Sequence, residues 1–190
     1  MIIPIGVDCQ LAQFLNKHQL RSCSFPFDWT VTYNGVYESI NNDFTQFTEP
    51  LINNINNYDM LFMHDFIDNT DDTEKYIRRC KRLKSVLETS REDIIFCRKG
   101  HVIRHHNEHN NKYNIIKNDI EDAEDLDIIL TKKYPQLKYK IIVILICGKC
   151  FELNKIYNSK SPNIELYNIS TCEMEQSACE DCFSKIFKTS

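Results

Sequence analysis

Cys9 has the clearest setting for covalent chemistry in this sequence. It follows an apolar segment, residues 2–5, that predicts a short strand, and it begins a segment with apolar residues at helical spacing. Asp8 is suited to cap that helix, which we expect over residues 9–18. The unpaired N–H groups and the dipole at the start of a helix favour an anion. This setting predicts a thiol of lowered pKa and a place to stabilise an oxyanion.

A nucleophilic cysteine needs a base within reach, and His64 is the best candidate because it follows a strand predicted over residues 58–63. In an open parallel sheet, residues that follow the strands meet at one edge, so we expect Cys9 and His64 to meet there. Asp65 is adjacent to His64, but neighbouring side chains of an extended chain point to opposite faces. Asp28 is therefore the better orienting carboxylate. The alternative is that Cys9 is a small packing residue and that the His-Asp pair closes a strand end.

Arginines support a second hypothesis, because Arg binds carboxylates and phosphates through two parallel hydrogen bonds. Arg98 follows a predicted strand at the presumed functional edge, and Arg78, Arg79 and Arg82 lie on one predicted helix. We expect Arg98, Arg78 and the aromatic Trp29 to bind an anionic substrate. The alternative is that the arginines are structural partners of buried aspartates, which we favour for Arg79 and Arg82.

Two C-x-x-C pairs could hold one structural zinc ion, because two thiolates at this spacing can coordinate the same tetrahedral metal ion. They are Cys147 with Cys150 and Cys179 with Cys182. The alternative is unligated thiols or an adventitious disulfide, so we expect that no cofactor is required. The histidines between residues 101 and 109 lie in an Asn-rich segment that is a poor helix, and we interpret them as loop residues.

The positions of these residues depend on strands that alternate with helices, which favours an α/β fold. Further strands are predicted over residues 93–97, 140–147 and 164–167, and further helices over 36–42, 73–89, 119–134 and 172–188. The polar stretch at 100–118 predicts a long loop. We expect a single three-layer domain over residues 1–190 with a mainly parallel central sheet. A papain-like α+β fold is the alternative.

The composition and charge of the chain argue against several classes of protein. The chain has 190 residues, a net charge of -4 and nine cysteines. This charge argues against a broad basic face for nucleic acid, and the longest apolar run, residues 141–147, is far shorter than a membrane span. The odd cysteine count and the absence of a signal-peptide pattern predict a cytoplasmic protein with reduced thiols. We expect a peptide, protein or anionic small molecule as substrate, with neither nucleic acid nor membrane as partner.

Several of these residues, taken in order, resemble a known family. They are Gly6-x-x-Cys9-x-x-Ala12, Arg21, Phe25-Pro26-Phe27-Asp28-Trp29, His64-Asp65-Phe66, Arg78-Arg79 with Arg82-Leu83, and Phe96-x-Arg98. In this order they resemble the "putative papain-like cysteine peptidase" family of bacterial and large-DNA-virus proteins. The similarity is strongest over residues 2–100, and residues 147–190 form a Cys-rich extension.

The resemblance implies a hydrolase in which Cys9 is the nucleophile and His64 its partner, with Asp28 or Asp65 assisting. It also implies a viral or bacterial source, and the host cytoplasm as location if the protein is viral. The competing hypothesis is a non-catalytic module of the same fold. Such a module would bind an anionic ligand or a host protein and could be stabilised by zinc in its C-terminal part.

Overall fold

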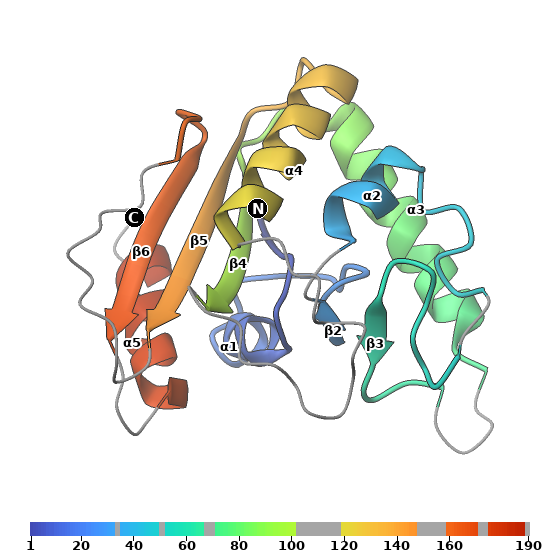
Figure 1. Cartoon of the computed structure of the whole chain (residues 1–190), viewed down its shortest axis with the longest axis horizontal. Helices are drawn as coiled ribbons and strands as arrows, with labels where there is room; N and C mark the ends of the chain where they lie inside the picture. The colour runs from blue at the N-terminus through green and yellow to red at the C-terminus, as the bar shows by residue number, and fades with distance from the viewer. Residues whose placement is uncertain are drawn as a thin grey trace.

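Four parallel strands form the central sheet in the computed structural model (Figure 1). The structure describes residues 1–32, 35–49, 52–66, 71–101, 119–147, 159–170 and 175–188. In spatial order the strands are β1 (Ile2–Pro4), β4 (Ile94–His101), β5 (Tyr139–Cys147) and β6 (Ile164–Ser170). All neighbours in this order run parallel, so the predicted α/β class with a parallel sheet is confirmed.

Strand β5 is central because its side chains are apolar on both faces, as a strand covered on both sides requires. Ile141, Val143 and Leu145 point into one hydrophobic core, while Ile142 and Ile144 point into the other. The period of two along a strand therefore divides one apolar run between two cores.

Helices cover both faces of the sheet and complete three layers. They are α1 (Gln10–Lys17), α2 (Val36–Asn41), α3 (Thr73–Thr89), α4 (Asp119–Lys133) and α5 (Glu175–Lys188). The core on one face is built with residues of α2, α3 and α4, and the core on the other face with residues of α1 and α5. Figure 1 shows α4 on the near side of the sheet and α5 on the far side. Among the described residues, no helix combines the length and apolar character needed to cross a membrane.

The strand before His64 does not belong to the parallel sheet. β3 (Met60–Phe62) pairs antiparallel with β2 (Thr30–Thr32) in a separate two-stranded ribbon. The N–H of Thr32 donates to the carbonyl of Val7 at 2.9 Å, which ties this ribbon to the chain just after β1. The expectation that His64 follows a strand of the parallel sheet is therefore wrong, although the ribbon lies beside that sheet.

Strand β4 is longer than the sequence predicts. It continues to His101, with Lys99 paired to Ile144 and Gly100 paired to Leu145 of β5. Arg98 therefore lies inside the strand and not after it, because a polar side chain does not end a strand when it finds partners in the interior. The rest of the predicted 100–118 loop lies outside the described residues.

Candidate active site

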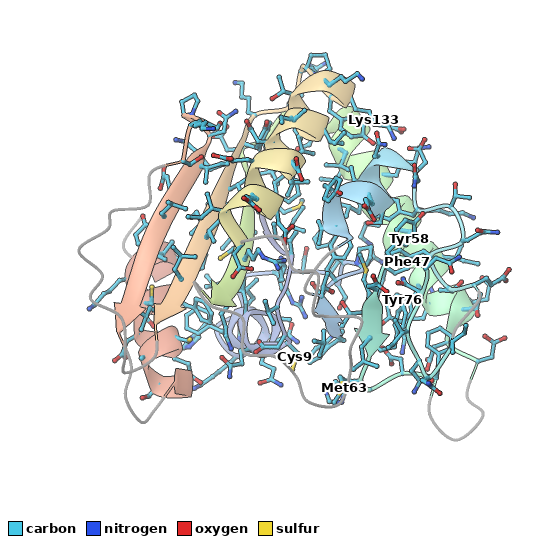
Figure 2. All side chains as sticks on the ribbon, viewed as in Figure 1. Cys9, Phe47, Tyr58, Met63, Tyr76 and Lys133 are labelled. Atoms are coloured by element: carbon cyan, nitrogen blue, oxygen red, sulfur yellow. The ribbon has the colours of Figure 1, made fainter. Side chains whose placement is uncertain are left out.

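The Sγ atom of Cys9 lies 4.0 Å from Nε2 of His64, although 55 positions separate the two residues in the sequence. Cys9 is partly buried immediately before α1, and His64 is exposed just after β3. Figure 2 shows Cys9 and Met63, the residue before His64, close together at the same end of the molecule. A thiol and an imidazole at this distance, open to solvent, could act together on a substrate.

The ribbon brings His64 to the thiol. Thr30 pairs with Phe62, so the chain that leaves β3 returns alongside the residues that precede β2. The ring of Trp29 meets the His64 ring edge to face, with centroids 6.5 Å apart and an interplanar angle of 81°. The predicted substrate-binding residue Trp29 is therefore a direct neighbour of the imidazole.

Polar side chains surround the thiol at the start of α1. Gln13 donates from Nε2 to Cys9 Sγ at 3.2 Å. Asp8 accepts from the Gln10 N–H at 2.9 Å, but Cys9 and not Asp8 occupies the N-cap position of α1. Lys99, whose side chain is 1% exposed, donates to Asp8 at 2.6 Å and to Gln10 at 2.9 Å. Sequence reasoning missed Gln13 and Lys99. The four-residue spacing of Cys9 and Gln13 on one helix face could have revealed Gln13.

The pKa of the Cys9 thiol is raised above its ordinary value, which contradicts the expected lowering. Burial disfavours the thiolate most, and the nearby Asp8 carboxylate adds to the effect. A backbone hydrogen bond and the Lys99 ammonium act in the opposite direction without overcoming it. The helix start therefore does not make Cys9 a preformed thiolate, and a base has to take its proton.

Asp28 lies in the interior next to Arg21. Its carboxylate forms an ion pair with Arg21 and accepts from the Phe25 N–H at 2.9 Å, so it holds the aromatic connector in place. Burial raises its pKa, and the Arg21 charge opposes this. Among the described residues, no hydrogen bond joins Asp28 to His64.

Asp65 is held on the side away from the imidazole. It pairs with Lys75 of α3 and accepts from the hydroxyl of Tyr76 at 2.6 Å. The expectation that neighbouring side chains diverge here agrees with this arrangement. Within the described part of the chain, neither candidate carboxylate is hydrogen-bonded to His64.

Arg98 is an interior ion-pair residue. Its side chain is 3% exposed, and its guanidinium donates to Asp119 at 2.9 Å and to Asp122 at 3.5 Å, both on α4. It also donates to the carbonyls of Ile5 and Thr32 at 3.1 and 3.2 Å. These contacts favour the structural role over substrate binding, since the donors are already used.

The helix arginines divide between surface and interior. Arg78 is exposed on α3, whereas Arg82 donates to the carbonyl of Ser24 and Arg79 lies over the Tyr76 ring at 5.0 Å. Among the described residues, neither forms the expected ion pair with a buried aspartate, because Asp28 pairs with Arg21 and Asp65 with Lys75. Arg78 makes none of these contacts and stays a predicted substrate residue.

The zinc prediction falls partly outside the described residues. Cys150 and the side chain of Cys147 are not described, while Cys179 is a fully buried free thiol and Cys182 is a partly buried one. Both helix thiols pack in or against the core between α5 and the sheet. Among the described residues there is no group of three or more potential metal ligands, and the histidines from 102 to 109 lie outside that range.

A cavity of about 280 Å³ lies next to the thiol site, between α1 and α5. Gln13, which contacts the Cys9 sulfur, lines it together with Gln10, Phe14 and Phe183. Lys17 and Glu180 also line it and form an ion pair of 3.0 Å. The space beside Cys9 is therefore lined by amide, aromatic and charged groups.

Comparison with known proteins found a similarity to a protein family. The similarity lies in the first third of the chain, which carries Cys9 and Asp28. No curated protein and no solved structure matches the chain. One family match covers residues 1–59, a shorter span than the 2–100 resemblance, and His64 lies beyond it. The model that matches residues 1–59 is that of the family described as "Putative papain-like cysteine peptidase (DUF1796)".

Proposed function

We propose that this protein is a cysteine-dependent hydrolase that cleaves an amide or peptide bond. The observation that carries the proposal is the 4.0 Å approach of Cys9 Sγ and His64 Nε2 at an accessible end of the molecule. The family match over residues 1–59 supports the same class of activity. The substrate class is a peptide or protein, with an anionic small molecule as the alternative.

In the proposed reaction, Cys9 Sγ attacks the carbonyl carbon while His64 takes the thiol proton. Because Nε2 faces the sulfur, the imidazole acts as base in the form that carries its proton on Nδ1. His64 then gives the proton to the leaving nitrogen as the C–N bond breaks, which leaves an acyl thioester on Cys9. Water then attacks this thioester while His64 takes one of its protons. The C–S bond breaks, the carboxylic acid leaves, and His64 returns the proton to Cys9 Sγ.

The donor for the developing oxyanion comes from α1. The Gln10 N–H already donates to Asp8 at 2.9 Å, so the donor is the Gln13 side-chain amide, which donates to the sulfur at 3.2 Å. The raised pKa of Cys9 supports a role for His64 as general base during attack.

An electrophilic thiol probe tests the proposal. We expect iodoacetamide to label Cys9 faster than the partly exposed Cys23 at neutral pH, and His64→Ala to abolish that advantage. Release of a fluorescent amine from a mixture of peptide amides should disappear in Cys9→Ala and persist in Cys23→Ala. Equal labelling of Cys9 and Cys23, with no amine release, would favour the non-catalytic binding module.

A further inference from the structure

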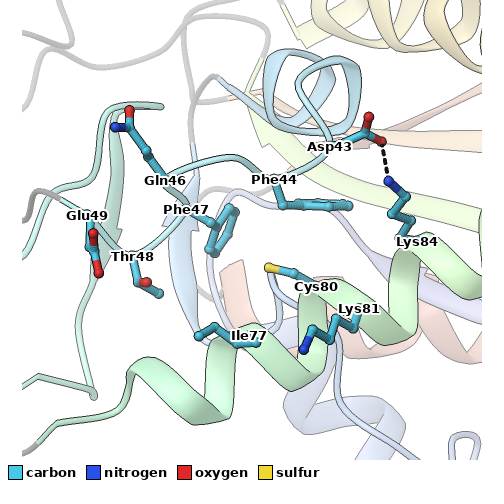
Figure 3. Close-up of a pocket in the computed structure, with 10 residues that line it drawn as sticks. All are labelled: Asp43, Phe44, Gln46, Phe47, Thr48, Glu49, Ile77, Cys80, Lys81 and Lys84. Carbon is cyan, nitrogen blue, oxygen red and sulfur yellow. Dashed lines mark ion pairs between the residues drawn. The ribbon is translucent and has the colours of Figure 1, made fainter.

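A second cavity, separate from the thiol site, lies between residues 43–49 and α3. Its volume is about 340 Å³, at the lower end of the range of small-molecule sites, which is roughly 300–1,000 Å³. It is lined by Asp43, Phe44, Gln46, Phe47, Thr48, Glu49, Ile77, Cys80, Lys81 and Lys84 (Figure 3). Neither Cys9 nor His64 lines it, so its role is independent of the proposed hydrolase.

The inner wall of this cavity is apolar. Phe44 and Phe47 meet edge to face with centroids 5.9 Å apart, and Ile77 and Cys80 face them from α3 (Figure 3). Burial raises the pKa of Cys80 to about 12, so this thiol behaves as an apolar group at neutral pH. The wall is suited to a ring or a short hydrocarbon chain.

The α3 rim carries two ammonium groups, those of Lys81 and Lys84. Lys84 pairs with Asp43 at 3.1 Å and with Glu88 at 3.9 Å, so its charge is engaged by carboxylates. Lys81 is exposed, and within the described part of the chain no ion pair or hydrogen bond engages it. Glu49 lies at the opposite end of the lining (Figure 3). The cationic end therefore has an ammonium group available for an anion.

The segment that carries the two phenylalanines has an unusual backbone. Asp43, Phe44 and Gln46 have φ values of 54°, 59° and 56°, in the left-handed region that bulky residues rarely adopt. The Phe44 N–H donates to the Ser39 carbonyl at 2.7 Å, which holds the turn. Strain of this kind persists where the surroundings enforce it, often at ligand sites. Here it fixes the aromatic wall opposite α3.

We propose that this cavity binds a small amphipathic anion, with its apolar ring or chain against Phe44, Phe47 and Ile77. Its carboxylate or sulfonate contacts Lys81. The apolar wall supplies the affinity for the ring or chain, and the unengaged ammonium selects an anion over a cation or a neutral molecule.

The experiment uses 8-anilinonaphthalene-1-sulfonate, a fluorescent aromatic sulfonate, as probe of the full-length protein. We expect saturable binding of one molecule per chain. Lys81→Glu should weaken binding by roughly tenfold, the size of one charge-assisted hydrogen bond. Arg91→Glu is the matched control, because it makes a comparable charge change at an exposed position just after α3 and outside the cavity. Ile77→Trp, which fills the cavity, should abolish binding.

Circular dichroism and the melting temperature establish that each variant is folded. The exposed position of Lys81 keeps the test valid if Ile77→Trp does not fold. Equal loss of affinity in Lys81→Glu and Arg91→Glu would overturn the proposal, as would the absence of saturable binding. Preference for a cationic dye, lost in Glu49→Gln, would also overturn it, because the acidic end would then be the binding determinant.

Discussion

The ammonium group of Lys99 lies 2.6 Å from the carboxylate of Asp8, and this ion pair fixes the residue immediately before Cys9. Lys99 is nearly inaccessible, and it reaches α1 from the face of the sheet opposite to Arg98. Two adjacent cations of β4 therefore hold the helical layers on either side. One of them also sets the electrostatic environment of the proposed nucleophile.

Replacing each partner of this pair should shift the reactivity of Cys9 in opposite directions. Asp8→Asn removes a charge that raises the thiol pKa, so we expect faster alkylation at a given pH. Lys99→Met removes a charge that lowers it, so we expect slower alkylation and a loss of about 1.5–3 kcal/mol in unfolding free energy. Iodoacetamide labelling followed by mass spectrometry measures the rates. Shifts of the same sign in both variants would exclude a charge effect.

Without its base, Cys9 should behave as a thiol of raised pKa. In His64→Ala, we expect alkylation to be slow at pH 7 and to rise about tenfold per pH unit. This rise should continue beyond the ordinary thiol pKa, since deprotonation is the unfavourable step. The pH dependence of the labelling rate between pH 6 and 10 checks this. A plateau below pH 7 would instead indicate the preformed thiolate that a helix start favours.

Arg98 should contribute mainly to the stability of the fold and not to ligand binding. Arg98→Met removes a buried cation that pairs with Asp119 and Asp122, so we expect a loss of about 3–5 kcal/mol in unfolding free energy. Urea unfolding measures this loss, with Arg78→Met as control at an exposed position. A fully stable Arg98→Met protein that fails to bind substrate would restore the substrate-binding role.

Asp65 should likewise support α3 and not His64. Asp65→Asn weakens contacts with Lys75 and Tyr76, so we expect a loss of about 1–3 kcal/mol in unfolding free energy. Labelling of Cys9 in the folded variant should keep its rate and pH dependence. A labelling defect as large as that of His64→Ala would identify Asp65 as the third catalytic group.

Gly6 should be required for the close packing of the Arg98 side chain between β1 and the ribbon. Its φ is +111°, and an added Cβ would lie 2.5 Å from the Thr32 carbonyl oxygen and 2.9 Å from Nη1 of Arg98. We expect Gly6→Ala to lower the unfolding free energy by at least about 1–3 kcal/mol. Ser90→Ala, at the end of α3, is a control outside this contact. Equal melting temperatures of Gly6→Ala and the wild type would contradict this explanation.

The pattern of apolar residues was enough to predict the layered architecture. The run at 141–147 is apolar on both faces, and the stripe through Tyr76, Leu83 and Leu87 has helical spacing, so their burial follows from local periodicity. Local sequence was also enough to single out Cys9. A predicted strand, an aspartate and a predicted helix follow one another within a few residues around it.

Tertiary structure alone decided how Cys9 and His64 meet and what surrounds them. The predicted meeting was at the edge of a parallel sheet, but the actual approach is made by an antiparallel ribbon joined through Thr32 and Val7. The sequence also could not show that Arg98 and Lys99 are buried, because their burial depends on carboxylates far from them in the sequence. The sign of the Cys9 pKa shift has the same origin. Desolvation and neighbouring charges depend on distances through space, which one-dimensional spacing does not contain.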